Sequence, residues 1–221
     1  MELPERPKWL ETALQGLAYW MGHRQSLYAK YPLTEGAMVA EACNLIFANL
    51  TPGLVLLPER LYKNLVSPSM KKFQGQSARV DLTICDDYVN QDNINANISG
   101  HVKYAIEIKR GLASNHLINA DLKRLYELKN AVDDDLRCLL FVISEGKAPK
   151  RFVKDGKSKL SWEKIPGCSG YYKVRRTVKA ASSFSSKEKA HYVCMLEVFR
   201  KRKILKKAIG RQNDSDRKAS N

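Results

Sequence analysis

Asp81, Glu107 and Lys109 are residues of types and spacings that suit metal-assisted chemistry. Asp81 lies in a segment that alternates apolar and polar residues, and Glu107 and Lys109 lie two positions apart in a second such segment. Both segments are predicted as strands, each with these side chains on one face. Carboxylates from neighbouring strands suit Mg²⁺, which also binds water, carbonyl oxygens and phosphate.

Glu107 and Lys109 alone are a weak signal, because a glutamate and a lysine two residues apart are also typical of the solvent-facing side of a strand. The surrounding sequence, Tyr-Ala-Ile-Glu-Ile-Lys, is strongly apolar. An ionised carboxylate in such surroundings is costly unless it is paired or binds a metal. The placement of Asp81 on a neighbouring strand therefore turns an ordinary ion pair into a candidate site.

The strands that would position this set are predicted over residues 78–85 and 101–109, with the polar segment 86–100 as the loop of a long hairpin. Amphipathic helices are predicted from residue 9 to about 28 and from about 36 to 49. Residues 54–57 fit either an edge strand or a packed loop.

A helix from about 119 to 132 and a near-continuous apolar strand over 137–144 are expected next. An apolar run of this kind is typical of a parallel strand covered on both faces, so strand, helix and strand form a plausible crossover unit. The segment 147–171 contains several Pro and Gly residues among its lysines and is interpreted as an irregular basic excursion. Residues 192–199 fit a strand or a helix, and their composition favours a strand.

The sequences Arg79-Val80-Asp81 and Glu107-Ile108-Lys109, with helices before and after them, resemble the PD-(D/E)XK, or restriction-endonuclease-like, nuclease superfamily. The likeness covers about residues 36–144, and Val80 stands where the superfamily name has proline. It implies an α/β restriction-endonuclease-like core, a central mixed sheet flanked by helices in the order helix, three strands, helix, strand.

The same resemblance implies a Mg²⁺ site, with Mn²⁺ able to substitute, formed by Asp81, Glu107 and the carbonyl of Ile108. Lys109 would orient or deprotonate the attacking water or stabilise charge on the phosphate. Glu41 is a further catalytic candidate, because related nucleases often carry a helix glutamate that reaches the metal. A glutamate at the border of the buried helix face explains Glu41 equally well.

Basic residues suggest where nucleic acid would bind. Lys123 and Arg124 belong to a segment, Asn-Ala-Asp-Leu-Lys-Arg-Leu, that resembles the helix after the Glu-x-Lys strand in defence-related members, although its Asp121 fits a solvated position. Further candidates interleave with Tyr171 and Tyr172, as backbone contacts and base stacking require. They are Lys173, Arg175 and Arg176. An exposed edge of a sheet would account for this mixture of aromatic and basic residues nearly as well as nucleic-acid binding does.

The net charge of +15 is confined to the C-terminal third. Residues 145–179 hold eleven Lys and Arg against three acids, and residues 200–221 hold nine against two, while the remainder is balanced. Localised charge of this size favours a polyanionic partner, and the alternative is a solvated basic surface with a disordered tail. The predicted organisation is an N-terminal helical extension (1–35), a nuclease-like domain (36–199) with a basic insertion at about 145–179, and a basic tail (200–221) expected to be disordered.

Several classes of protein are disfavoured. The five cysteines form no CxxC pair and are expected to be reduced, and no signal peptide or membrane-length apolar run is present, so a soluble cytoplasmic protein is expected. The histidines lack metal-ligand spacing, which disfavours zinc, and the absence of a Walker-type loop excludes a nucleotide cofactor in this chain.

The resulting expectation is a Mg²⁺-dependent endodeoxyribonuclease that acts on DNA in restriction or anti-phage defence. It includes a possible homodimer or a partner subunit that supplies target recognition. Two alternatives remain open: a structure-selective repair or recombination nuclease, and a catalytically idle nucleic-acid-binding module on the same fold.

Overall fold

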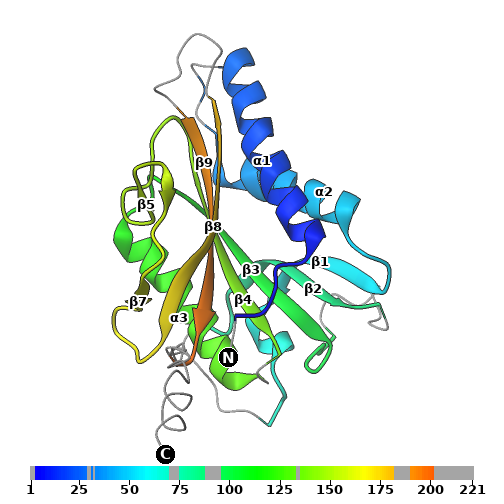
Figure 1. Ribbon diagram of the computed structural model, residues 1–221. Coiled ribbons are helices and arrows are strands. Elements are labelled where there is room, and N and C mark those ends of the chain that lie inside the picture. Colours follow the sequence, from blue (N-terminus) through cyan, green and yellow to red (C-terminus); the bar gives the residue numbers. More distant parts are fainter. Residues whose placement is uncertain are drawn as a thin grey trace, which may run out of the picture.

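A computed structural model describes residues 3–28, 31, 33–69, 75–87, 96–132, 135–181 and 190–201. Its main feature is a seven-stranded mixed sheet in the order β1-β2-β3-β4-β9-β8-β7 (Figure 1). The strands are β1 (Leu54–Leu61), β2 (Arg79–Asp86), β3 (Val102–Arg110), β4 (Arg137–Ser144), β7 (Trp162–Lys164), β8 (Tyr171–Ala181) and β9 (Ala190–Phe199). Strands β5 (Val153–Lys154) and β6 (Lys157–Ser158) form a separate hairpin.

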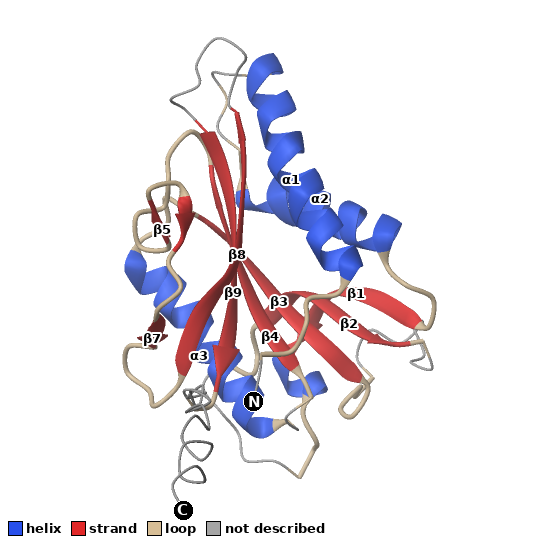
Figure 2. Cartoon of the chain, in the orientation of Figure 1, coloured by secondary structure: helices blue, strands red, loops and turns tan. Residues whose placement is uncertain are grey.

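Helices cover both faces of the sheet. Helices α1 (Lys8–Leu27) and α2 (Glu35–Asn49) pack on one face, and α3 (Asn115–Ala131) packs on the other (Figure 2). Each face has its own apolar cluster, because alternate residues of the central strands point to opposite sides. The expected mixed α/β sheet flanked by helices is therefore present.

The strands that carry the candidate site occupy one half of the sheet. Strands β2 and β3 pair antiparallel, and β3 and β4 pair parallel with α3 as their crossover. This confirms the predicted hairpin and crossover unit. From α2 to β4, the chain follows the expected order of helix, three strands, helix and strand.

Several boundaries differ from the predictions. Helix α2 starts at Glu35 rather than 36, because the Thr34 hydroxyl caps it by accepting a hydrogen bond from the Ala37 N–H. Helix α3 starts four residues before 119, at Asn115, where Ser114 is the capping residue. Residues 54–57 belong to strand β1, and residues 192–199 lie in strand β9.

The predicted irregular segment 147–171 contains more regular structure than expected, because it includes β5, β6 and β7. The predicted extension 1–35 contains α1, which packs on α2, β8 and β9 and contributes to the same apolar cluster as they do. Residues 88–95 of the predicted hairpin loop and residues 202–221 of the predicted tail lie outside the described residues. Within the part of the chain that is described, no helix combines the length and apolar character needed to cross a membrane.

Candidate active site

Asp81 and Glu107 meet where β2 and β3 stop pairing. The paired residues end at Leu82 and Ile106, and the same register continued by one position sets Asp81 opposite Glu107. Asp81 Oδ2 accepts a hydrogen bond of 2.6 Å from the main-chain N–H of Ile108. A side-chain hydrogen bond between the Asp81 and Glu107 carboxyl groups also lowers the pKa of Asp81. The two carboxyl groups therefore belong to facing residues at the end of the β2–β3 ladder.

Glu107 is almost fully enclosed, with 3% of its surface exposed. The buried Tyr62 hydroxyl, in a short 3-10 turn after β1, donates to Glu107 Oε1 at 2.5 Å. On the other side, Arg124 Nε of α3 lies 3.9 Å from the same oxygen. One donor and one cation therefore hold Glu107 in place.

Burial raises the pKa values of both carboxyl groups. Burial raises the pKa of Asp81 to about 6, against the opposing hydrogen bond from Ile108. Burial also raises the pKa of Glu107 well above its ordinary value, and the charges of Asp81 and Asp121 add to that shift. Two adjacent carboxyl groups that resist ionisation together form a position where a cation would be stabilised.

Lys109 projects from β3 into contact with two further acids. Its Nζ lies 2.7 Å from Glu35 Oε1 of α2 and 3.3 Å from Asp121 Oδ2 of α3. Burial lowers the pKa of Lys109, but the hydrogen bond to Glu35 and the charge of Asp121 outweigh that effect, and the net pKa is raised. In this arrangement Lys109 is an ammonium ion, which suits orientation of water or stabilisation of phosphate charge better than proton abstraction.

Glu35, rather than Glu41, is the α2 glutamate that reaches this set. Glu35 Oε2 also accepts a hydrogen bond of 3.4 Å from the main-chain N–H of Arg110. Glu41 is half-buried further along α2 and makes no described hydrogen bond or ion pair with the site. Sequence reasoning missed Glu35 because the helix was expected to begin one residue later, although Thr34 before an acidic residue is a signal for a helix start.

Asp121 is buried rather than solvated, with 2% of its surface exposed. It forms ion pairs with Lys109 of β3 and with Arg124, three residues further along α3. Burial raises the pKa of Asp121, and the charges of Lys109 and Arg124 oppose that shift. The spacing of Asp121 and Arg124, which places both on one helix face, was the available signal for this role.

The five predicted nucleic-acid contacts divide into two groups. Arg124 adjoins the site, and Lys123 lies beside it on α3, 3.9 Å from Glu127. The other three belong to β8, which β4 and β9 separate from β3. They are Lys173, Arg175 and Arg176. The Lys173 Nζ is 5.5 Å from the centre of the Trp162 ring, and Arg175 and Arg176 are both half-buried, with Arg175 paired with Glu197.

The residues that could hold a Mg²⁺ ion are those that the resemblance implies, Asp81, Glu107 and Ile108. Asp81 and Glu107 occupy facing positions on β2 and β3, and Asp81 reaches the main chain of β3. The Ile108 carbonyl faces β2, because the N–H and C=O of one strand residue project to the same side and its N–H points to Asp81. Among the described residues no group of three or more His, Cys, Asp and Glu converges on one point. Mg²⁺ does not need such a cage, since it commonly uses one or two carboxylates and keeps several waters.

No protein-family model matches the chain, and neither a curated protein nor a solved structure matches it. The candidate site therefore rests on the geometry of its own residues.

Proposed function

We propose that the protein is a Mg²⁺-dependent nuclease with a restriction-endonuclease-like core that hydrolyses DNA phosphodiester bonds, and that it acts in restriction or anti-phage defence. The observation that supports this most strongly is the placement of Asp81 and Glu107 opposite each other at the point where β2 and β3 stop pairing. A structural role alone gives no reason to bury two adjacent acids, because burial raises the pKa of each carboxyl group and makes its ionised form costly.

Each residue of the set has a distinct role in this proposal. Asp81 and Glu107, with the Ile108 carbonyl, would hold the metal. When bound, the metal stabilises charge on the phosphate and lowers the pKa of its water. Lys109, fixed by Glu35 and Asp121, presents an ammonium group to the water and the phosphate. Arg124, paired with Asp121 beside Glu107, supplies a second cation for the phosphate oxygens.

DNA is the proposed substrate because the charge of the chain favours a polyanion. The net charge is +15, and the excess lies in the C-terminal third. Cations attract nucleic acid by releasing the counterions of its phosphates, independently of base sequence.

A specific observation also favours the second candidate, a catalytically idle nucleic-acid-binding module. The Tyr62 hydroxyl and the Arg124 guanidinium already stabilise the carboxyl group of Glu107 without any metal. In an idle module this network would serve only to join α3 to the sheet.

Plasmid cleavage in Mg²⁺, Mn²⁺ or EDTA tests the proposal. We expect Asp81→Asn, Glu107→Gln and Lys109→Met to reduce the cleavage rate by about 100-fold or more. Asp86→Asn and Lys103→Met are matched controls, since Asp86 and Lys103 lie on the same two strands and form a half-buried ion pair of 3.2 Å with each other. Both controls should cut as the wild type does.

Three outcomes would redirect the proposal. Equal cutting by all variants would exclude the assigned site. A wild type that binds DNA tightly but never cuts it would favour the idle module. Preferential cutting of branched DNA by a dimer would favour the alternative of a repair or recombination nuclease.

A further inference from the structure

The β5–β6 hairpin has a backbone that holds lysine side chains in defined positions. Its turn residues, Asp155 and Gly156, have φ values of 51° and 70°. Positive φ at both central residues is typical of the tight hairpin turn whose twist matches the flanking strands, and Asp-Gly is a preferred sequence for it. Lys154 and Lys157 therefore flank the turn directly, and Lys159 follows β6.

The hairpin is fastened to the body of the protein. Ser158 Oγ donates to Thr177 Oγ1 of β8 at 2.9 Å, and the Lys159 N–H donates to the Phe152 carbonyl at 2.9 Å. The Val153 side chain is buried in the apolar cluster beneath α3. A fixed hairpin presents its charges without the ordering cost that a flexible segment incurs on binding.

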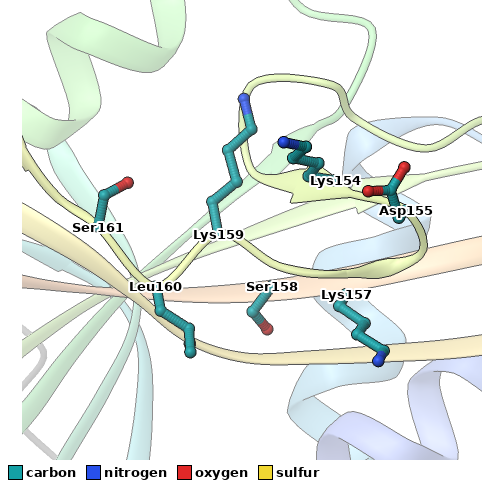
Figure 3. A pocket seen from close by; sticks show the side chains of 7 residues that line it. All are labelled: Lys154, Asp155, Lys157, Ser158, Lys159, Leu160 and Ser161. Carbon is teal, nitrogen blue, oxygen red and sulfur yellow. The ribbon is translucent and has the colours of Figure 1, made fainter.

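Four lysines lie on or next to this hairpin, and no described carboxylate forms an ion pair with any of them. Lys154, Lys157 and Lys159 line an open hollow of about 640 Å³, whose one acidic residue is the exposed Asp155 (Figure 3). Lys179 of β8 adds a fourth cation, because its Nζ lies 3.4 Å from the position that a Cβ on Gly156 would take. Unpaired like charges held together repel one another, and a polyanion removes that repulsion.

A line of contacts connects the hairpin with the candidate site. Arg151, just before β5, donates to Asn119 Oδ1 at 2.7 Å and to Asn115 Oδ1 at 3.4 Å, both near the start of α3. A second hollow, of about 590 Å³, runs along α3. The residues on α3 that line it are His116, Asn119, Ala120, Lys123, Arg124 and Glu127. Arg124 ends this line at the site, 3.9 Å from Glu107.

We propose that the β5–β6 hairpin and Lys179, together called the lysine platform, bind the phosphate backbone of the DNA several nucleotides from the bond that is cut. The path along α3 from Arg124 to Asn115 covers roughly 14 Å, at about 1.5 Å per helical residue. That length corresponds to about four nucleotides of one strand, at roughly 3.4 Å each. The platform holds the strand by charge and reads no base sequence. This inference rests on the proposed function for the position of the cut, but not for the binding of DNA.

DNA binding measured in EDTA, on an Asp81→Asn background that cannot cut, tests the platform. The test variant is Lys154→Gln/Lys157→Gln. The control is Lys8→Gln/Lys63→Gln, which removes the same charge from exposed lysines of α1 and of the turn after β1. Fluorescence anisotropy of a labelled duplex is followed as the salt concentration rises.

In the test variant, the magnitude of the slope of log K against log salt should fall by about 1.8, because each phosphate that the protein no longer neutralises removes roughly 0.9. The control variant should have the wild-type slope. This decrease in slope should appear with a duplex long enough to reach from the candidate site to the lysine platform. It should be absent with a duplex that covers only the candidate site and α3. Equal slopes for the two double variants, or the same decrease on both duplexes, would overturn the platform.

The platform and the nuclease assignment fail separately. A wild type that never cuts DNA, but whose binding depends on Lys154 and Lys157, would retain the platform and reject the nuclease. Cleavage that requires Asp81, combined with DNA binding that does not depend on Lys154 and Lys157, would retain the nuclease and reject the platform.

Discussion

Asp81 Oδ2 accepts a hydrogen bond from the main-chain N–H of Ile108, the residue between Glu107 and Lys109. The side chain of one strand thus bonds the main chain of the next at the point where their ladder ends. This bond ties the position of Asp81 to the part of β3 that carries the other two residues. The three groups therefore keep their mutual geometry without a metal.

The first prediction is that Asp81→Asn stabilises the protein when no divalent cation is present. The folded-state pKa of Asp81 is about 6, above the ordinary value of 3.8, so ionisation costs stability as pH rises from about 4 to 6, and the loss is complete above that range. Asparagine keeps an acceptor for the Ile108 N–H but carries no charge. We expect a gain on the order of 1 kcal/mol at pH 8, or about 2–4 °C in Tm.

Thermal melts over a range of pH would measure this gain, with Asp86→Asn on the same strand as the control. The advantage of Asp81→Asn should shrink as pH falls from 6 to 4. Added Mg²⁺ should stabilise the wild type and leave Asp81→Asn unaffected. An Asp81→Asn protein that is less stable than the wild type at pH 8 would show that the buried, ionised Asp81 does not destabilise the fold.

The second prediction separates two glutamates of α2. Glu35 contacts Lys109, whereas Glu41 has no described contact with the site. Glu35→Gln keeps the size of the side chain but weakens its hold on the ammonium group. We expect it to lower kcat for DNA cleavage by about tenfold with little change in KM, because a misplaced catalytic group affects the chemical step.

Glu41→Gln is the matched control and should change kcat less than twofold, a difference of about 0.4 kcal/mol. Steady-state cleavage kinetics with a linear duplex would provide both constants. A large loss in Glu41→Gln together with normal activity in Glu35→Gln would restore Glu41 as the helix residue of the site.

The sequence predicted the shared face of Asp81, Glu107 and Lys109 because strands have a simple period of two. It did not predict the contacts of Glu35 and Asp121 with Lys109, because these join side chains of three separate elements, α2, β3 and α3. Contacts of this kind depend on how helices cross the sheet, and no local pattern encodes that.

Strand β1 illustrates a different limit. Its apolar run is short and ends at Pro58, so the sequence left residues 54–57 undecided between an edge strand and a packed loop. In the structure, Glu59 has a positive φ of 55°. Pairing with β2 along the sheet edge, where a proline is tolerated, nevertheless continues the strand to Leu61. The tertiary partner outweighs local propensity there.

The third prediction concerns Glu197 of β9, which is 3% exposed and lies between two arginines. Arg137 Nε and Nη2 donate to its carboxylate at 2.9 and 3.0 Å, and Arg175 forms a second ion pair. The same arginines donate to the carbonyls of Glu5 and Pro4, so Glu197 also orders the segment before α1. Glu197→Gln leaves two buried cations without a counter-charge and should cost about 3–5 kcal/mol of unfolding free energy.

Urea denaturation would measure that loss, with Glu163→Gln on the exposed strand β7 as the control. Arg175→Gln should be destabilising as well, since its side chain is committed to Glu197 rather than to solvent. A normal unfolding free energy for Arg175→Gln, combined with weakened DNA binding, would instead support the sequence-based expectation that Arg175 contacts nucleic acid.

The fourth prediction is that His191 makes the protein sensitive to mild acid. His191 is fully buried on β9, and both ring nitrogens lack a hydrogen-bond partner in the described structure. Burial lowers its pKa, against the opposing charge of Glu145. Because the folded pKa lies below the unfolded one, stability is complete above about pH 6.5 and is lost as pH falls below it, by at most about 1.4 kcal/mol per pH unit.

His191→Leu replaces the unpartnered ring with an apolar side chain of similar size and should flatten this loss. Tm values measured from pH 7.5 down to 5.5 should fall less for His191→Leu than for the wild type, whereas the exposed His101→Leu should follow the wild-type curve. Raised pKa values of Asp81 and Glu107 act in the opposite direction, since those groups gain stability as they are protonated. These two groups are common to all three proteins, so the difference between the curves isolates His191. Parallel curves would show that the pKa of His191 is the same in the folded and unfolded states.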